Sequence, residues 1–194
     1  MTVLNIAMVG SDDLAKSIAK ATDQRDVHTY VHKESGADGP RILSIIRPAK
    51  MPERIRPFFN ALCAARVGLI EVTEINAAFG EVLVGFASAG VEKGIMVINP
   101  PEGEWIDEDQ VKGFLTQAGL KSWTQCGNDG IEIRHALYGL MDEISGDLES
   151  AKKEPLVVPI DQHFNVKGIG LVAIGYVQSG SVSVHDELHL LPAE

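Results

Sequence analysis

The feature of this sequence that most limits its fold is a series of short apolar runs, each followed by residues with helical periodicity. Three such runs span residues 3–9, 67–72 and 94–98. A strand with so little polar alternation is typical of a parallel sheet that helices cover on both faces. The pattern therefore predicts an α/β domain with a mostly parallel sheet and helices on both faces.

Turn signals and helical spacing give the remaining elements. Two strand candidates, 27–31 and 42–46, flank the turn-rich segment 35–40, and no helix fits between them, so we expect antiparallel neighbours. Apolar spacing predicts the helices, and Pro52 is expected to open the second of them. The other expected elements are helices over 12–21, 52–63, around 82–87, 106–117 and 131–144, and a short strand over 122–125.

The chain changes character after its first 145 residues. Residues 146–155 are polar and predict a linker between two domains. Residues 156–194 combine β-branched residues with Gly and Ser turns, which predicts strands over 156–160, 170–177 and 181–184. This segment is too short to close a barrel of its own, so we expect a barrel that is incomplete in this sequence or a segment that docks on the first domain.

Charge and composition exclude several classes of function. The net charge of −10 argues against non-specific binding to nucleic acid, which depends on Lys and Arg neutralising phosphates. No apolar stretch approaches the roughly 18 residues that span a bilayer, and the N-terminus lacks the pattern of a signal peptide. Cys63 and Cys126 are far apart and predict neither a disulfide framework nor a zinc site. We therefore expect a cytoplasmic protein without membrane contact. Separately, we interpret Trp105 and Trp123 as packing residues.

One segment resembles a phosphate-binding loop. Gly10, Lys16 and Ser17 match the pattern G-x-x-x-x-G-K-[S/T], whereas Ala15 replaces its second glycine. That glycine lets the backbone approach the phosphates closely, and an alanine there costs on the order of 1 kcal/mol or more. Lys16 could contact phosphates and Ser17 could bind Mg²⁺. The alternative is a plain amphipathic helix with an exposed Lys16.

The C-terminal segment has the most specific motifs. Residues 158–172 read V-P-I-D-Q-H-F-N-V-K-G-I-G-L-V. Residues 175–182 read G-Y-V-Q-S-G-S-V, and residues 186–192 read D-E-L-H-L-L-P. In this arrangement the chain resembles the translational GTPases, specifically elongation factor Tu and the selenocysteine-specific elongation factor. The resemblance implies a P-loop GTPase-like domain followed by the N-terminal half of a domain II β-barrel.

The resemblance assigns site residues unevenly. Gly10, Asp13, Lys16 and Ser17 fall on the first nucleotide-binding motif of the family, with Ser17 as the metal ligand. The family segment D-x-P-G-H, which holds Mg²⁺ and positions the attacking water, is replaced by residues 47–51, Arg47-Pro48-Ala49-Lys50-Met51. For guanine recognition, Asn99 and Glu102 stand where the family has N-K-x-D, and Thr124-Gln125-Cys126 stands at its S-A-x segment.

These residues imply a diverged translation elongation factor-like protein that binds GTP or GDP with Mg²⁺ weakly or not at all and lacks intrinsic hydrolysis. The implied partners are the ribosome or aminoacyl-tRNA, contacted through the domain II segment. Two alternatives stay open. One is a partner-docking scaffold without nucleotide, and the other is an active GTPase with a rearranged site, in which a partner supplies missing groups.

Overall fold

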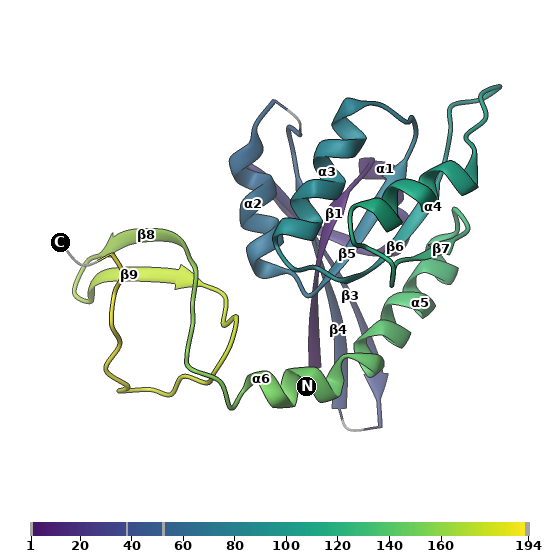
Figure 1. Cartoon of the computed structure of the whole chain (residues 1–194). Coiled ribbons are helices and arrows are strands. Elements are labelled where there is room, and N and C mark those ends of the chain that lie inside the picture. Colours follow the sequence, from purple (N-terminus) through teal and green to yellow (C-terminus); the bar gives the residue numbers. More distant parts are fainter. Residues whose placement is uncertain (1, 38, 52, 193–194) are drawn as a thin grey trace. The chain divides into compact units, whose positions relative to one another are not determined.

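The computed structural model describes residues 2–37, 39–51 and 53–192, and these form two units, residues 1–143 and 144–194 (Figure 1). Each unit is described by itself below. The elements of the first unit are β1 (Thr2–Val9), α1 (Asp12–Ile18), β2 (Lys20–Gln24), β3 (Val27–Gly36), β4 (Gly39–Pro48), α2 (Ile55–Ala64), β5 (Val67–Val72), α3 (Ala77–Ser88), β6 (Lys93–Ile98), α4 (Glu108–Gln117), β7 (Thr124–Cys126) and α5 (Gly130–Glu143).

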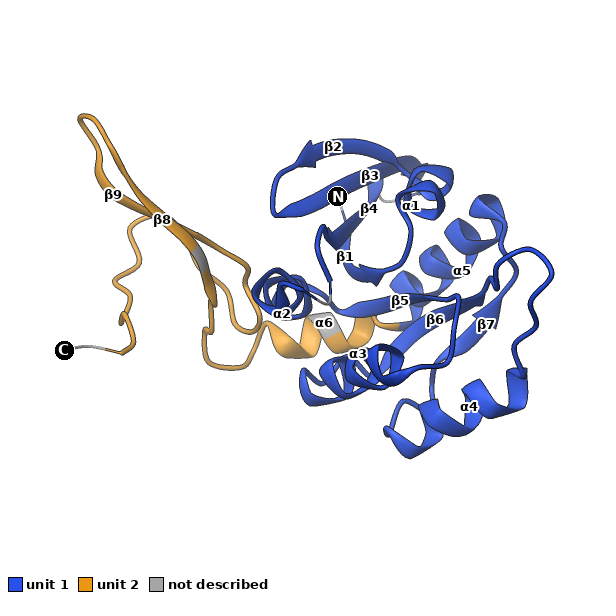
Figure 2. Ribbon diagram, turned by 90° about the horizontal axis from the view of Figure 1, so that it is seen from above, with its two compact units in different colours: residues 1–143 blue, residues 144–194 orange. Residues whose placement is uncertain are grey.

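The first unit is built on one seven-stranded sheet in the order β2-β3-β4-β1-β5-β6-β7. Strands β4, β1, β5, β6 and β7 are parallel to one another, and β3 is antiparallel to β4. Helices α2, α3 and α4 cover one face, and α1 and α5 cover the other (Figure 2). The predicted α/β class with a mostly parallel, doubly covered sheet is confirmed.

The expected antiparallel pair is also confirmed, and it is longer than the sequence pattern suggested. Strands β3 and β4 pair from Val27 opposite Pro48 to Gly36 opposite Gly39, which forms a continuous hairpin. The turn-rich segment is therefore mostly strand. Gly39 has a φ of 113°, which glycine adopts readily and other residues rarely do. This conformation allows the chain to reverse direction there.

The first helix is shorter than predicted. We expected a helix over residues 12–21, but α1 ends at Ile18, and Ala19 has an extended backbone with φ −148° and ψ 160°. The chain then forms β2, an edge strand antiparallel to β3. The hydroxyl of Thr22 lies 2.8 Å from that of Thr29 on β3. Pairing of residues 20–24 with the edge of the sheet outweighs their helical pattern. That pattern was weak, because Ala21 was its last apolar position.

Trp123 fixes the packing of β5 and β6. It is 7% exposed, its indole N–H donates to the carbonyl of Val91 at 3.3 Å, and its ring meets that of Phe86 at 5.0 Å between centroids. A Cβ on Gly68 of β5 would lie 2.3 Å from the indole, and one on Gly94 of β6 would lie 2.6 Å from it. Two glycines on neighbouring strands thus make room for one indole, and the prediction of Trp123 as a packing residue is confirmed.

The second unit has less regular structure. Its elements are α6 (Ser145–Ala151), β8 (Ile160–Val166) and β9 (Gly170–Gly175). Helix α6 lies in the first part of the segment expected as a linker. Strands β8 and β9 form a two-stranded antiparallel sheet, and Val157 makes an isolated bridge to Ser179. Two strands close no barrel, and apolar side chains such as Ile169 and Leu171 are exposed at 76% and 66%.

The strands predicted over 156–160 and 181–184 are wrong. The first begins only at Ile160, and residues 181–184 have no strand structure. In the described part of the chain, residues 181–184 have no neighbouring strand, and an alternating pattern without backbone pairing forms no stable strand in water.

Two further observations bear on the sequence predictions. Pro52, expected to open the second helix, lies outside the described residues, and α2 begins at Ile55. Within residues 2–37, 39–51 and 53–192, no helix is long and apolar enough to cross a membrane.

The close contact of Trp123 with Gly94 gives a testable consequence. We expect Gly94→Ala to destabilise the protein by about 1–3 kcal/mol, because the new Cβ would meet both the indole and, at 2.7 Å, the carbonyl oxygen of Gly68. The free energy of unfolding in urea measures this. Gly113→Ala in α4 is the control, since no atom lies within 4 Å of its Cβ position, and it should stabilise by roughly 0.5–1 kcal/mol. Equal effects of both variants would contradict the packing role.

Candidate functional site

The carboxyl ends of the parallel strands are the place to look for a site in an open α/β sheet. Gly10 and Ser11 follow β1, Arg47 lies near the end of β4, Glu71 near the end of β5, and Asn99 directly after β6. Hydrogen bonds connect these residues. The candidate site therefore contains Gly10 and Asn99, which the sequence proposed, together with Arg47 and Glu71.

Glu71 is the residue that sequence reasoning missed. It is only 8% exposed, and its two carboxylate oxygens accept from different elements. Oε2 accepts from the backbone N–H of Ser11 at 2.5 Å, and Oε1 accepts from Nδ2 of Asn99 at 2.7 Å. The signal in the sequence was one acid inside the otherwise apolar run 67–72, since a buried charge needs partners.

Gly10 is required by this contact. A Cβ at that position would lie 2.8 Å from Cβ of Glu71 and 3.0 Å from its Oε2. The glycine therefore allows β1 and β5 to hold the carboxylate against the turn after β1. In a phosphate loop the same absence of a side chain would admit a phosphate.

Arg47 stands where the resemblance expects a Mg²⁺-binding aspartate. Its Nε donates to the carbonyl oxygen of Gly10 at 2.8 Å, and its Nη1 lies 3.3 Å from Nδ1 of His28. This residue therefore ties the end of β4 to the turn after β1. In the same segment Pro48 is buried, Met51 is half-buried and Lys50 is exposed.

Helix α1 begins immediately after the turn. Ser11 is its N-cap and accepts from the N–H of Leu14 at 3.1 Å, and Asp12 is already its first residue. Asp13 is exposed in the first turn. Four of the residues between Gly10 and Lys16 are thus helical, and the chain forms no open loop between them.

Lys16 lies in the last turn of α1 and forms an ion pair with Asp12. The hydroxyl of Tyr30 also donates to Asp12. The hydrogen bond from Lys16, followed by that from Tyr30, holds the pKa of Asp12 below its usual range. Burial, together with the bond to Asp12, raises the pKa of Tyr30 to about 12. The Lys16 ammonium therefore has a partner within its own helix.

Ser17 lies against the beginning of α5. Its hydroxyl donates to the carbonyl oxygen of Leu14 at 2.7 Å. A Cβ on Gly130 would lie 2.3 Å from the Ser17 carbonyl oxygen and 2.8 Å from its Oγ. Across the described residues, no group of three or more His, Cys, Asp and Glu side chains is arranged to hold a metal ion.

The two residues expected to recognise a base are separated. Asn99 directs its amide toward Glu71, while its backbone N–H donates to the carbonyl of Val72 at 2.9 Å. Glu102 is exposed in the loop that follows. The structure thus brings Gly10 and Asn99 together through Glu71, and Glu102 stays apart from them.

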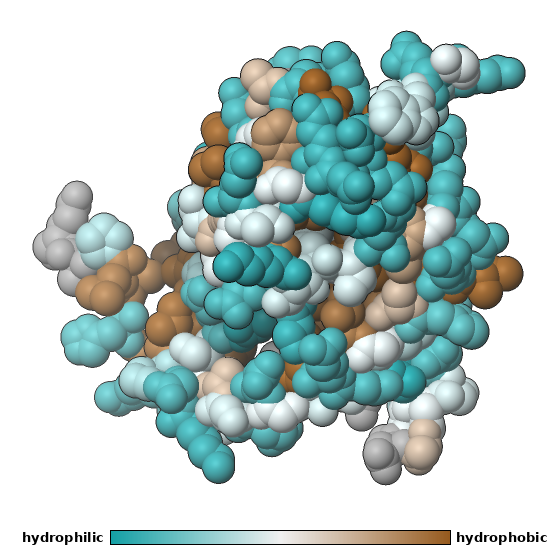
Figure 3. All heavy atoms as spheres, turned by 45° about the vertical axis from the view of Figure 1, so that its right-hand side comes forward, coloured by the Kyte–Doolittle hydropathy of each residue, from teal (hydrophilic) through white to brown (hydrophobic). Residues whose placement is uncertain are grey.

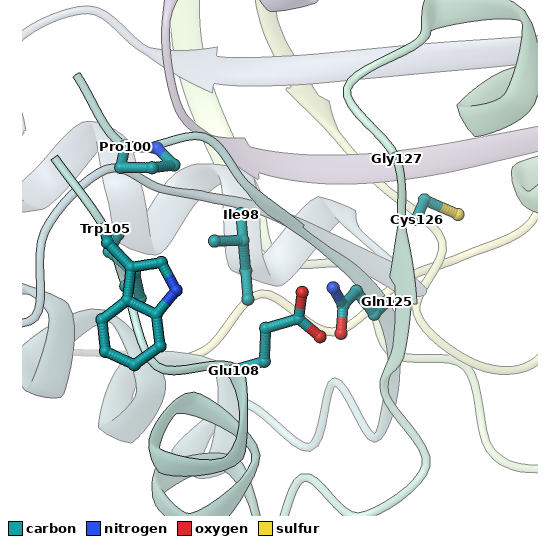
Figure 4. Close-up of a pocket in the computed structure, with 8 residues that line it drawn as sticks. Ile98, Pro100, Trp105, Glu108, Gln125, Cys126 and Gly127 are labelled. Atoms are coloured by element: carbon teal, nitrogen blue, oxygen red, sulfur yellow. The ribbon is translucent and has the colours of Figure 1, made fainter. Parts of the chain in front are cut away.

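A cavity of about 690 Å³ opens between the loops that follow β6 and β7. Figure 4 shows the side chains of Glu108 and Gln125 pointing toward one another in it, with the indole of Trp105 beyond Glu108. The residues that line it are Ile98, Pro100, Trp105, Ile106, Glu108, Gln125, Cys126 and Gly127. Neither Asn99 nor Glu102 is among them.

Trp105 and Cys126, which line this cavity, differ in exposure. Trp105 was predicted to pack, and this is wrong: it is 80% exposed, because the loop after Pro100 and Pro101 leaves the sheet before Ile106 returns to the core. Cys126 is buried, and burial raises the pKa of its thiol.

Known protein sequences include relatives of this chain. None of the protein-family models compared matches the chain. An uncharacterised protein of Methanocaldococcus jannaschii is 28% identical over 195 residues, which cover all of this chain and 59% of that protein. The selenocysteine-specific elongation factor of the same organism is 36% identical over 61 residues, which are 31% of this chain and 13% of that protein. The chain thus spans 59% of the length of the first relative.

Solved structures agree over nearly the whole chain. A bacterial selenocysteine-specific elongation factor superposes with a TM-score of 0.63 at 21% identity, covering 93% of this chain and 35% of that one. Elongation factor SelB from Methanococcus maripaludis, in complex with the GTP analogue GppNHp, gives 0.62 at 20% identity and covers 99% and 45% of the two chains. The chain has the translational GTPase-like fold of the selenocysteine-specific elongation factors.

Proposed function

We propose that this chain is a translation elongation factor-like protein of the elongation factor Tu and selenocysteine-specific type, whose first domain is a pseudo-GTPase. One observation supports the pseudo-GTPase part most directly. The carboxylate of Glu71 accepts from the Ser11 N–H, in the turn where a phosphate loop would offer its N–H groups to a nucleotide. A phosphate there would displace a carboxylate and lie beside its negative charge.

The remaining phosphate contacts are poorly placed as well. In a phosphate loop, the Lys and Ser of the motif stand at the beginning of the helix. Here Lys16 and Ser17 are in the last turn of a seven-residue helix. Lys16 pairs with Asp12, and Asp13 adds a second negative charge at the helix start. Gly10, Asp13, Lys16 and Ser17 therefore support at most weak binding of GTP or GDP.

The residues present do not fit Mg²⁺ or hydrolysis. The Ser17 hydroxyl is bonded within α1, and the guanidinium of Arg47 lies where a Mg²⁺-binding carboxylate would be needed. Asn99 donates to Glu71, so its amide is directed away from the neighbouring cavity in which a base could lie. No step of phosphoryl transfer is therefore assigned to this chain.

We further propose that residues 156–194 are the N-terminal half of a domain II barrel, joined by residues 146–155 to a first domain of residues 1–145. The motifs of this segment and the elongation-factor fold support contact with the ribosome or with aminoacyl-tRNA in the cytoplasm. The exposed apolar side chains of β8 and β9 are expected of a barrel segment that is incomplete in this sequence.

The nucleotide part of the proposal is tested by titrating nucleotide-free protein with fluorescent GTP, GDP and ATP, with and without Mg²⁺. We expect no saturable binding below about 1 mM. Lys16→Ala is the matched variant and should behave identically. Guanine-selective binding that this variant loses would show that the turn opens to phosphate, and would overturn the pseudo-GTPase assignment.

The translation part is tested by sedimenting the protein with ribosomes and by its retention with aminoacyl-tRNA. We expect binding that is the same with GTP, with GDP and without nucleotide. Lys167→Glu, in the turn between β8 and β9, should weaken it, because Lys167 is exposed and is the one basic residue within 156–194. Lys153→Glu, equally exposed but outside this segment, is the control. Binding to neither partner would contradict the proposal.

The role of Glu71 is tested through stability. We expect Glu71→Leu to lower the free energy of unfolding by about 1–3 kcal/mol, because it leaves the Ser11 N–H and the Asn99 amide without their acceptor. Urea denaturation measures the change. Glu81→Leu on the exposed side of α3 is the control and should change stability by less than about 0.5 kcal/mol. An unchanged or raised stability of the Glu71 variant would show that the carboxylate does not hold the turn.

A further inference from the structure

The cavity beside Trp105 has no role in the pseudo-GTPase proposal, and its residues are unusual for a loop on a protein surface. Trp105 is 80% exposed, and among the described residues it makes no aromatic contact. An exposed indole is a common anchor of protein–protein interfaces, because it buries a large area with few rotatable bonds. We call this cavity, with its lining residues given above, the Trp105 pocket.

The loop that carries Trp105 is strongly negative, and one of its acids, Glu108, lines the pocket. The segment from Glu102 to Asp109 has five acids and no Lys or Arg: Glu102, Glu104, Asp107, Glu108 and Asp109. Asp107 is used as the N-cap of α4. Glu108 lies 3.7 Å from Lys112, an exposed pair that solvent screens. Glu102 and Glu104 make no ion pair within the part of the chain that the structure describes.

The charge of this loop disfavours a polyanion as occupant of the pocket. Phosphates of a nucleotide or an RNA strand would approach this row of acids, and the Asn99 amide, which could have met a base, is bonded to Glu71. A cation is favoured instead. It would gain from the carboxylates and from the face of the exposed indole, the aromatic ring that binds cations best.

We propose that the Trp105 pocket binds an arginine side chain from a basic segment of a partner protein. The planar guanidinium would stack on the indole of Trp105 and donate to the Glu108 carboxylate and the Gln125 amide oxygen, which point toward one another in Figure 4. The aliphatic stem would contact Ile98 and Pro100. The volume of about 690 Å³ exceeds that of one side chain, so neighbouring residues of the segment fit as well.

The surroundings of the pocket agree with a polar partner surface. In Figure 3 the molecule is turned so that the side with α4 and α5 comes forward. Hydrophilic side chains predominate in this view, with apolar ones scattered among them. An interface here would therefore have a polar rim around one aromatic anchor, which is the usual organisation of a transient complex. This site does not depend on whether nucleotide binds at the turn after β1.

The test uses the full chain and the peptide acetyl-Gly-Arg-Leu-Arg-Gly-amide, followed by calorimetry and by Trp fluorescence. We expect saturable binding with a Kd on the order of 100 μM, accompanied by a change in the emission of the exposed indole. The peptide with Lys in place of Arg should bind several-fold more weakly, because it cannot stack. The peptide with Glu in place of Arg should not bind.

Variants separate a defined pocket from diffuse attraction. Trp105→Ala and Glu108→Gln should each weaken binding roughly 3- to 30-fold. Both residues are exposed, so the fold should persist, and circular dichroism verifies this. Glu81→Gln removes one equally exposed acid from α3 and should leave the affinity unchanged.

Three results would overturn the proposal. One is the absence of saturable binding up to about 1 mM peptide. Another is an equal loss in Glu81→Gln and Glu108→Gln, which would mean attraction to net charge alone. The third is displacement of the peptide by GTP or by poly-uridine together with a change in Trp105 emission, which would make the pocket a nucleotide or RNA site. Failure of the peptide test leaves the nucleotide titration of the proposed function unaffected.

Discussion

The carboxylate of Glu71 is the interaction on which the arrangement of the candidate site depends. It is buried near the end of β5, a strand whose other side chains are apolar, so it must be satisfied by hydrogen bonds. The Ser11 N–H and the Asn99 amide satisfy it, and they bring the turn after β1 and the end of β6 to the same point. Gly10 lacks a side chain because this carboxylate needs the space.

The local structure around this carboxylate follows from the same constraint. With the Ser11 N–H engaged, Ser11 caps a helix that begins at Asp12, and no loop remains between β1 and α1. Lys16 and Ser17 are consequently displaced to the last turn, where partners within the helix satisfy them. Arg47 closes the other side by donating to the Gly10 carbonyl. The turn after β1 is therefore closed by hydrogen bonds within the chain.

A second constraint separates the other half of the site from the turn. Asn99 donates to Glu71 and is not among the residues that line the cavity after β6 and β7. What remains in the cavity is an exposed indole and an acidic loop. The carboxyl edge of this sheet thus has two regions of different chemistry, one closed by internal hydrogen bonds and one open and negatively charged.

The sequence by itself determined the α/β class and the antiparallel pair, because apolar periodicity reports which faces are covered. It could not determine where α1 ends, since the pairing of β2 with β3 is a non-local interaction. It also assigned Lys16, Ser17 and Asn99 to nucleotide contacts, by matching their positions in the chain to family motifs. Only the tertiary structure decided their partners, because the buried Glu71, 60 residues from Ser11, accepts hydrogen bonds from the Ser11 N–H and the Asn99 amide.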